Sequence, residues 1–399
     1  MFPGSENSSL RDERLSAPQL ATNRRAGDPT QGPRPGSAGS LDADTGCGPV
    51  FQTDPQPQEY HVYDPERQEI RVVLIHPPKR RYWVHALLLL VTVFATLAYG
   101  AAMQESFNRN LGLFAEADWP FQWVLQDWHR LGLGIPYSAC LLGILLAHEL
   151  GHYVFCVLRR VFATLPFFLP SPLPVGTFGA FIRIRSPIPS RAALFDIGIA
   201  GPIAGFVVAV PVLIFGLLAS KPLTGDAAAN AASGNSMVIG FPLIFHLAHW
   251  AMSAMGSTSA AMQAPVTGLY LHPAAMAAWV GMFATSLNLL PGGQLDGGHI
   301  IFAVKPRLHR TASIVSSVLL VVMSWYLWAG WLLWALVLRF TGTRHPDVPL
   351  LPRLDLKRRV LAVFAVIMLL LTLTPAPFPT SLQSLLQQHK NPQPSQPAR

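Results

Sequence analysis

Six stretches of the chain are apolar over lengths that suit a membrane span. They cover residues 82–103, 131–158, 194–219, 272–290, 312–340 and 360–374. About 20 apolar residues in a helix cross the hydrocarbon core of a bilayer, so each stretch predicts a transmembrane helix or nearly one. The fifth stretch could form one tilted helix, or two short helices that turn near Ala329 and Gly330.

Charged residues between the stretches predict how the chain is oriented. Lys and Arg gather within 79–81, 159–191 and 305–310, whereas Glu and Asp gather within 105–127. Because basic loops favour the cytoplasmic side, the N-terminus is expected to be cytoplasmic. The basic residues within 339–359 lie on that side only if 312–340 crosses twice, which gives about seven spans.

Composition supports a membrane protein independently of the spans. The chain is 51% hydrophobic and 13% charged, about half the charged fraction of a soluble protein. Its net charge of +8 comes from residues that flank the spans, where anionic lipid attracts them, so nucleic acid is not an expected partner. We therefore expect an all-α integral membrane protein, a multi-span helical bundle in contact with the lipid bilayer.

The segments outside the spans differ in character. Residues 1–80 are rich in Ser, Pro, Gly, Asp and Arg and contain no signal-peptide core, which predicts a disordered cytoplasmic N-terminal tail. Partial alternation within 60–75 favours a strand there. Residues 220–270 read as an external insertion at the membrane interface, 81–376 as the membrane-embedded domain, and 377–399 as a C-terminal tail.

The connection between the second and third stretches cannot be a continuous helix. Its first half, 165–174, holds four prolines, and 176–185 is rich in aromatic and β-branched residues. We expect a small β-hairpin or a re-entrant loop. An edge strand here could pair with an extended substrate, which makes Gly179 a candidate substrate-positioning residue; the alternative is a loop that only plugs the site.

The sequence His148-Glu149-Leu150-Gly151-His152 lies within the second stretch and carries candidate chemistry. Histidines four residues apart share one face of a helix, where both can bind one zinc ion. Zinc lowers the pKa of its bound water, and Glu149 could act as the general base that accepts its proton. Ionisable groups in an apolar span are costly, which favours a metal site over structural histidines.

A catalytic zinc needs a third protein ligand. The segment 288–299, Asn-Leu-Leu-Pro-Gly-Gly-Gln-Leu-Asp-Gly-Gly-His, ends the fourth stretch in a glycine-rich turn that carries Asp296. From the residues alone, Asp296 could instead cap the next helix, and His299 is a rival ligand.

The two motifs together resemble the site-2 protease family of intramembrane zinc metalloproteases, in the short form without a PDZ domain. A glycine-rich segment at 195–205, between the two motifs, agrees with that family, although it could serve only close helix packing. The resemblance implies that His148, His152 and Asp296 hold Zn²⁺ and that Glu149 is the catalytic base. Asn288 matches the family's asparagine, which could position the substrate or satisfy the helix end.

The resemblance implies an endopeptidase that cleaves transmembrane protein substrates in or near their membrane spans, after another protease has trimmed them. The alternatives are a membrane zinc protease of the prenyl-protein-processing type and a non-catalytic membrane scaffold or transporter. We expect a bacterial cytoplasmic membrane, with a plastid membrane as the alternative. The sequence does not indicate the oligomeric state.

Overall fold

The computed structural model describes residues 58–64, 69–75, 82–111, 119–225, 228, 239–340, 348, 354–378 and 380–390. All of them belong to one compact unit, Pro55–Arg399. Most of the expected N-terminal tail, and part of the expected C-terminal tail, lie outside the described residues. Within the former, β1 (Gln58–Asp64) pairs antiparallel with β2 (Glu69–Ile75), which confirms the expected strand and adds its partner.

Four helices are long and apolar enough to cross a membrane among the residues described. They are α1 (Tyr82–Arg109), α3 (Ile135–Leu158, continuing a 3₁₀ turn from Trp128), α4 (Arg191–Leu218) and α9 (Pro306–Tyr326). The helices α7 (Pro273–Asn288) and α11 (Leu356–Thr372) are shorter, at 16 and 17 residues. The chain is an integral membrane protein with a mostly helical fold, as its apolar stretches predict.

The fifth apolar stretch contains two helices. After α9 the chain breaks at residues 327–330, and α10 (Trp331–Phe340) then packs back against α9. A tryptophan pair, Trp328 and Trp331, closes the turn with ring centroids 5.6 Å apart. The break therefore includes Ala329 and Gly330, where the sequence analysis places the turn if this stretch forms two helices.

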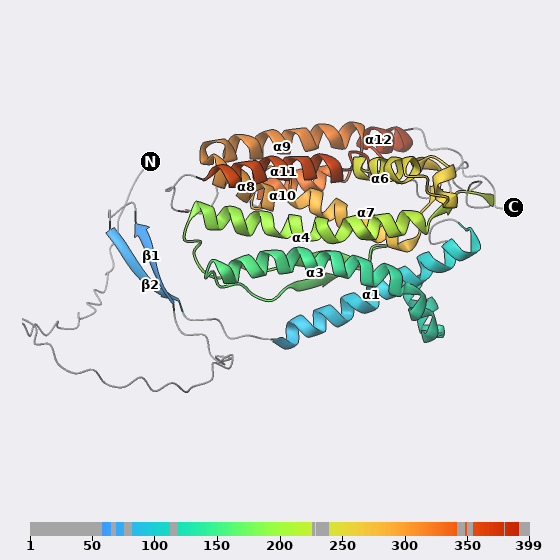
Figure 1. Cartoon of the computed structure of the whole chain (residues 1–399), viewed down its shortest axis with the longest axis horizontal. Coiled ribbons are helices and arrows are strands. Elements are labelled where there is room, and N and C mark those ends of the chain that lie inside the picture. Colours follow the sequence, from blue (N-terminus) through green and yellow to red (C-terminus); the bar gives the residue numbers. More distant parts are fainter. Residues whose placement is uncertain are drawn as a thin grey trace, which may run out of the picture. The chain divides into compact units, whose positions relative to one another are not determined.

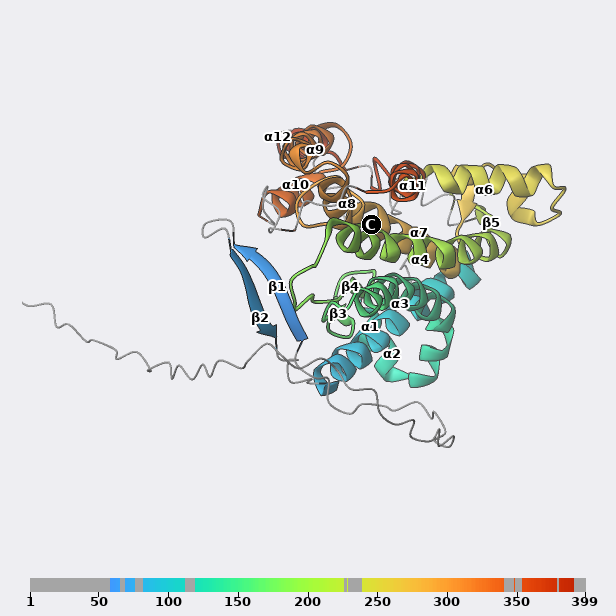
Figure 2. The ribbon, with the colours of Figure 1, turned by 60° about the vertical axis from the view of Figure 1, so that its left-hand side comes forward.

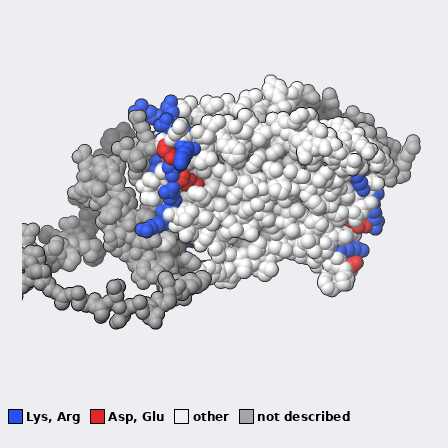
Figure 3. Space-filling model, in the orientation of Figure 1, with Lys and Arg blue, Asp and Glu red and all other residues white. Residues whose placement is uncertain are grey.

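The core lies between α3, α4 and α7, which run side by side (Figure 1). Tyr137, Leu141, Leu213 and Met282 from these three helices are fully buried in one apolar cluster. On the face drawn in Figure 3, Lys, Arg, Asp and Glu occupy the two ends, and a broad belt between them carries other residues only. Such a belt suits the hydrocarbon region of a bilayer.

A two-stranded sheet connects α3 to α4. Strands β3 (Phe167–Pro170) and β4 (Thr177–Phe181) are antiparallel, and they lie against α1 and α3 (Figure 2). Their register shifts at Leu169/Pro170, opposite Gly179, whose φ of +107° is a conformation that glycine adopts without strain.

The remaining elements are short. They are α2 (Pro120–Gln126), the strand pair β5 (Lys221–Pro222) and β6 (Leu269–Tyr270), α6 (Leu243–Ala254), α8 (Asp296–Val304) and α12 (Leu382–Lys390). At 12 residues α6 is about 18 Å long.

Candidate metal centre

The two histidines of the second stretch lie on the same face of α3. His148, Glu149 and His152 are only 4%, 5% and 6% exposed. A helix turn separates the two rings, whose centroids are 4.9 Å apart. Three ionisable side chains are therefore held together inside an apolar helix, where they need polar partners.

Asp296 supplies the partner for both rings. Its Oδ2 lies 3.2 Å from Nε2 of His148 and 3.2 Å from Nε2 of His152. Ligand atoms of a tetrahedral zinc site, each about 2.1 Å from the metal, lie about 3.4 Å apart, so this set fits a zinc ion. Among the described residues it is the group of His, Cys, Asp and Glu side chains that could hold a metal, and His299 is not part of it.

The glycines around Asp296 allow α8 to begin against the preceding turn. A Cβ on Gly297 would lie 2.1 Å from the carbonyl oxygen of Leu289, and one on Gly298 would lie 2.5 Å from that of Gly293. The first turn of α8 is therefore in backbone contact with the loop that follows α7. This close approach brings Asp296 to the histidines.

Two contacts orient the histidine rings. Nδ1 of His152 lies 2.7 Å from the carbonyl oxygen of Ile197 and donates to it, which leaves Nε2 as the metal-binding atom. The side-chain amide of Asn288 lies 3.3 Å from Nε2 of His148. Asn288, the last residue of α7, thus reaches the ligand cluster itself.

The glycine-rich part of α4 leaves room for these rings. A Cβ on Gly201 would lie 2.1 Å from Nε2 of His152, and one on Gly205 would lie 3.2 Å from Nδ1 of His148. The close helix packing expected for this segment is present, and the neighbours that require it are the two candidate ligands.

A cavity of about 210 Å³ opens beside the cluster. Glu149, His152, Asn288 and Asp296 supply polar side chains to its wall. The apolar part of the wall comes from the end of β4, the segment after it, and the start of α4: Ala180, Phe181, Ile182, Ile184, Ile188, Leu194 and Ile197. Gly179 is not among the lining residues; it pairs with Leu169 in the sheet.

Residues 136–327, which contain every element of this cluster, match the profile of Peptidase family M50. The chain is similar to this family over these 192 residues, just under half of its length. The match covers both sequence motifs and the glycine-rich part of α4 between them, so the resemblance to the site-2 proteases is confirmed.

Relatives of this chain carry matching names. "Probable zinc metalloprotease EGY1, chloroplastic" of Arabidopsis thaliana is 32% identical over 251 residues, which cover 60% of this chain and 43% of that protein. "Probable zinc metalloprotease EGY2, chloroplastic" of the same plant is 29% identical over 248 residues, 61% of this chain and 42% of that protein. The chain thus matches less than half the length of each.

The names of both relatives describe them as chloroplastic. They agree with the plastid alternative and give no support to the expectation of a bacterial cytoplasmic membrane.

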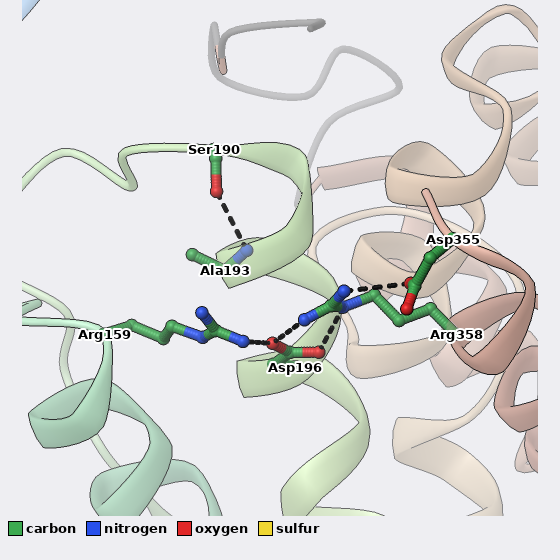
Figure 4. A network of polar contacts seen from close by, with 6 residues as sticks. All are labelled: Arg159, Ser190, Ala193, Asp196, Asp355 and Arg358. Carbon is green, nitrogen blue, oxygen red and sulfur yellow. Dashed lines mark hydrogen bonds and ion pairs between the residues drawn. The ribbon is translucent and has the colours of Figure 1, made fainter. Parts of the chain in front are cut away.

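A charged contact that the sequence did not predict connects α11 to α4 and to the residue after α3 (Figure 4). Asp196 of α4, 7% exposed, accepts from Nε and Nη2 of Arg358 at 2.7 Å and 2.8 Å, and also from Arg159 just after α3. Arg358 donates to Asp355 as well, at 2.9 Å, which lowers the pKa of that exposed carboxyl. A carboxylate inside an apolar stretch was the available signal, because it needs a cation.

Arg191 forms a second buried contact of this kind. It is the first residue of α4, and its guanidinium donates to the carbonyl oxygens of Ala303 and Val304 at 2.9 Å each. These carbonyls end α8, the helix that begins with Asp296. A cation there satisfies carbonyls that have no partner within the helix and complements the helix dipole.

Proposed function

We propose that this chain is a zinc-dependent intramembrane endopeptidase that hydrolyses peptide bonds in or near the membrane spans of other proteins. The observation that carries the proposal is the buried group of His148, His152 and Asp296, with Glu149 beside it on a cavity, within helices that suit a membrane. The match of residues 136–327 to Peptidase family M50 supports the same activity.

The donor set supports zinc as the metal. Two imidazoles and one carboxylate leave a fourth tetrahedral position open, the arrangement of catalytic rather than structural zinc sites. When bound, zinc supplies a Lewis acid and a water whose pKa is lowered towards neutrality. His148, His152 and Asp296 would hold it.

Glu149 fits the role of general base. Its carboxylate lines the cavity that His152 and Asp296 also line, so a water in that cavity is within its reach. It would accept the proton of the attacking water and pass it to the leaving amine. The apolar wall of the cavity restricts bulk water around this proton transfer.

Asn288 suits the binding of the substrate carbonyl. In the structure its side-chain amide contacts Nε2 of His148, the nitrogen atom that would bind the metal. Once that nitrogen is a ligand it no longer accepts from Asn288, and the amide is available to donate to a carbonyl oxygen in the cavity.

The strand β4 suits an extended substrate. It leads directly into Phe181 and Ile182 on the cavity wall, and its partner β3 covers one edge only. A substrate strand added at the other edge would expose its carbonyls to Glu149, whereas a helical substrate would hide them. In this proposal β3 and β4 re-enter the membrane, and Gly179 shapes the edge through its backbone rather than through the cavity.

We also propose the topology and its segments. Seven spans, with α9 and α10 crossing as a pair, place the N-terminal tail 1–80 in the cytoplasm and the insertion 220–270 outside. The membrane domain covers 81–376, and 377–399 form a C-terminal tail. The two charged ends and the apolar belt of Figure 3 support such an arrangement.

The experiment is cleavage of a single-span model substrate by purified protein in detergent. We expect wild type to cleave it, Glu149→Gln to lose at least about 100-fold in rate, and Glu105→Gln to keep the wild-type rate. Glu105 is a matched control because it pairs with Arg109 at the end of α1, away from the cavity. Equal rates for wild type and Glu149→Gln would contradict the proposal. One bound zinc per chain with cleavage of prenylated substrates only would favour the prenyl-protein-processing alternative.

A further inference from the structure

Three buried polar side chains lie in the first half of helix α9, a span of membrane length. His309, Ser313 and Ser316 are 2%, 0% and 7% exposed. Their spacing of four and three residues puts them on one face of the helix. We call these three side chains, His309, Ser313 and Ser316, the stripe. Buried polar groups in an apolar span are costly unless they have hydrogen-bond partners, so the partners of the stripe indicate its role.

All three side chains contact the backbone of the loop that leads to Asp296. Nε2 of His309 donates to the carbonyl oxygen of Gly293 at 2.9 Å, and the amide of Gly293 donates to Oγ of Ser313 at 3.1 Å. Oγ of Ser316 donates to the carbonyl oxygen of Pro291 at 3.1 Å. Three hydrogen bonds thus hold residues 291–293, which have no regular secondary structure.

This loop supports the first turn of α8 directly. A Cβ on Gly298 would lie 2.5 Å from the carbonyl oxygen of Gly293 and 2.6 Å from that of Gly292. A Cβ on Gly292 would in turn lie 2.9 Å from Cα of Ser313. Helix α9, the loop and the start of α8 are therefore in contact without intervening side chains, and a shift of the loop would move Asp296.

We infer that His309, Ser313 and Ser316 are positioning residues that fix the carboxylate of Asp296 at its place between His148 and His152. The inference rests on the proposed zinc site. It predicts that the stripe controls metal affinity and ligand geometry, in addition to satisfying the backbone of a loop.

The test compares substitutions on the stripe with a matched change elsewhere on α9. The test variants are His309→Leu, Ser313→Ala and Ser316→Ala. The control is Ser324→Ala, because Ser324 is 1% exposed on the same helix and its hydroxyl donates to the carbonyl oxygen of Val321, also on α9, at 2.6 Å. The conservative variant is His309→Gln, whose side-chain amide can still donate to Gly293.

The readouts are the affinity for Zn²⁺, measured by competition with a chromogenic chelator, the visible spectrum of the Co²⁺-substituted protein, and the melting temperature. We expect His309→Leu and Ser313→Ala to bind zinc about 10- to 100-fold more weakly and to change the Co²⁺ spectrum. His309→Gln should recover most of both. Ser324→Ala should match wild type in affinity and spectrum even if its melting temperature falls.

Wild-type affinity and spectrum in His309→Leu, Ser313→Ala and Ser316→Ala would overturn the inference and leave the stripe a structural role. If His309→Leu or Ser313→Ala does not fold, the result for Ser316→Ala, which removes one hydrogen bond at the start of the loop, takes the place of that variant in the test. A wild-type protein that binds no metal would instead overturn the proposed function, so the two failures are distinguishable.

Discussion

Replacement of Gly201 by alanine is the sharpest perturbation of the candidate metal centre that substitutes none of its ligand residues. The added Cβ would lie 2.1 Å from Nε2 of His152, whereas ordinary contacts begin near 3.4 Å. The ring or the helix must therefore move by about 1.3 Å. Metal–ligand distances tolerate only about 0.2 Å, and a misplacement of about 1 Å costs roughly 100-fold in catalysis.

Two further glycines make this prediction a graded series. A Cβ on Gly205 would lie 3.2 Å from Nδ1 of His148, so a shift of a few tenths of an ångström suffices, while a Cβ on Gly143 of α3 meets nothing within 4 Å. We expect Gly201→Ala to lose about 100-fold in cleavage rate, Gly205→Ala to lose much less, and Gly143→Ala to match wild type.

The assay measures zinc affinity and turnover of a single-span substrate for the three variants, after a thermal melt has shown that each is folded. If folded Gly201→Ala protein had the zinc affinity and turnover of Gly143→Ala, the His152 ring would not depend on the space that Gly201 leaves, contrary to this prediction.

Three other predictions follow from the contacts described. Replacing Asp196 by Asn removes the carboxylate that holds Arg358, so the free energy of unfolding should fall by about 3 kcal/mol. The control Asp355→Asn changes the exposed partner of Arg358 and should have the melting temperature of wild type. Equal melting temperatures for the two variants would contradict the role of Asp196. Removal of zinc with a chelator should abolish cleavage and lower the melting temperature, since a ligand at a hundred times its Kd stabilises the folded protein by about 2.7 kcal/mol. A melting temperature that changes with neither chelator nor added zinc would argue against the zinc site. In sealed vesicles of known orientation, an impermeant maleimide should label Arg185→Cys from the cytoplasmic side and Met255→Cys from the other, and labelling of both from one side would contradict the proposed topology.

Much of the candidate centre could be predicted because its residues occur in short sequence motifs whose spacing determines the local geometry. The spacing of His148 and His152 fixes a common helix face. Asp296 could be selected over His299 only through the pairing of two motifs 140 residues apart, which the contacts between His148 and Asn288 now bring together. The apolar stretches predicted where the helices lie, since their length alone sets what can span a bilayer.

The contacts that support the centre could not be read from the chain. Asp196 and Arg358 are 162 residues apart, and nothing local to either names the other. Ser313 in an apolar helix looks like any small residue of a membrane span until its partner, the amide of Gly293, is known. The glycines of α4 predicted close packing, but the neighbour of Gly201 is a ligand ring rather than a helix backbone. Each of these depends on tertiary placement rather than on periodicity.

The most direct test of the central claim is zinc content measured beside cleavage on the same preparations of wild type, Glu149→Gln and Asp296→Asn. We expect one zinc per chain and cleavage for wild type, one zinc without cleavage for Glu149→Gln, and weakened zinc binding with loss of cleavage for Asp296→Asn. Wild type that holds no zinc after reconstitution, or Asp296→Asn that binds and cleaves like wild type, would contradict it.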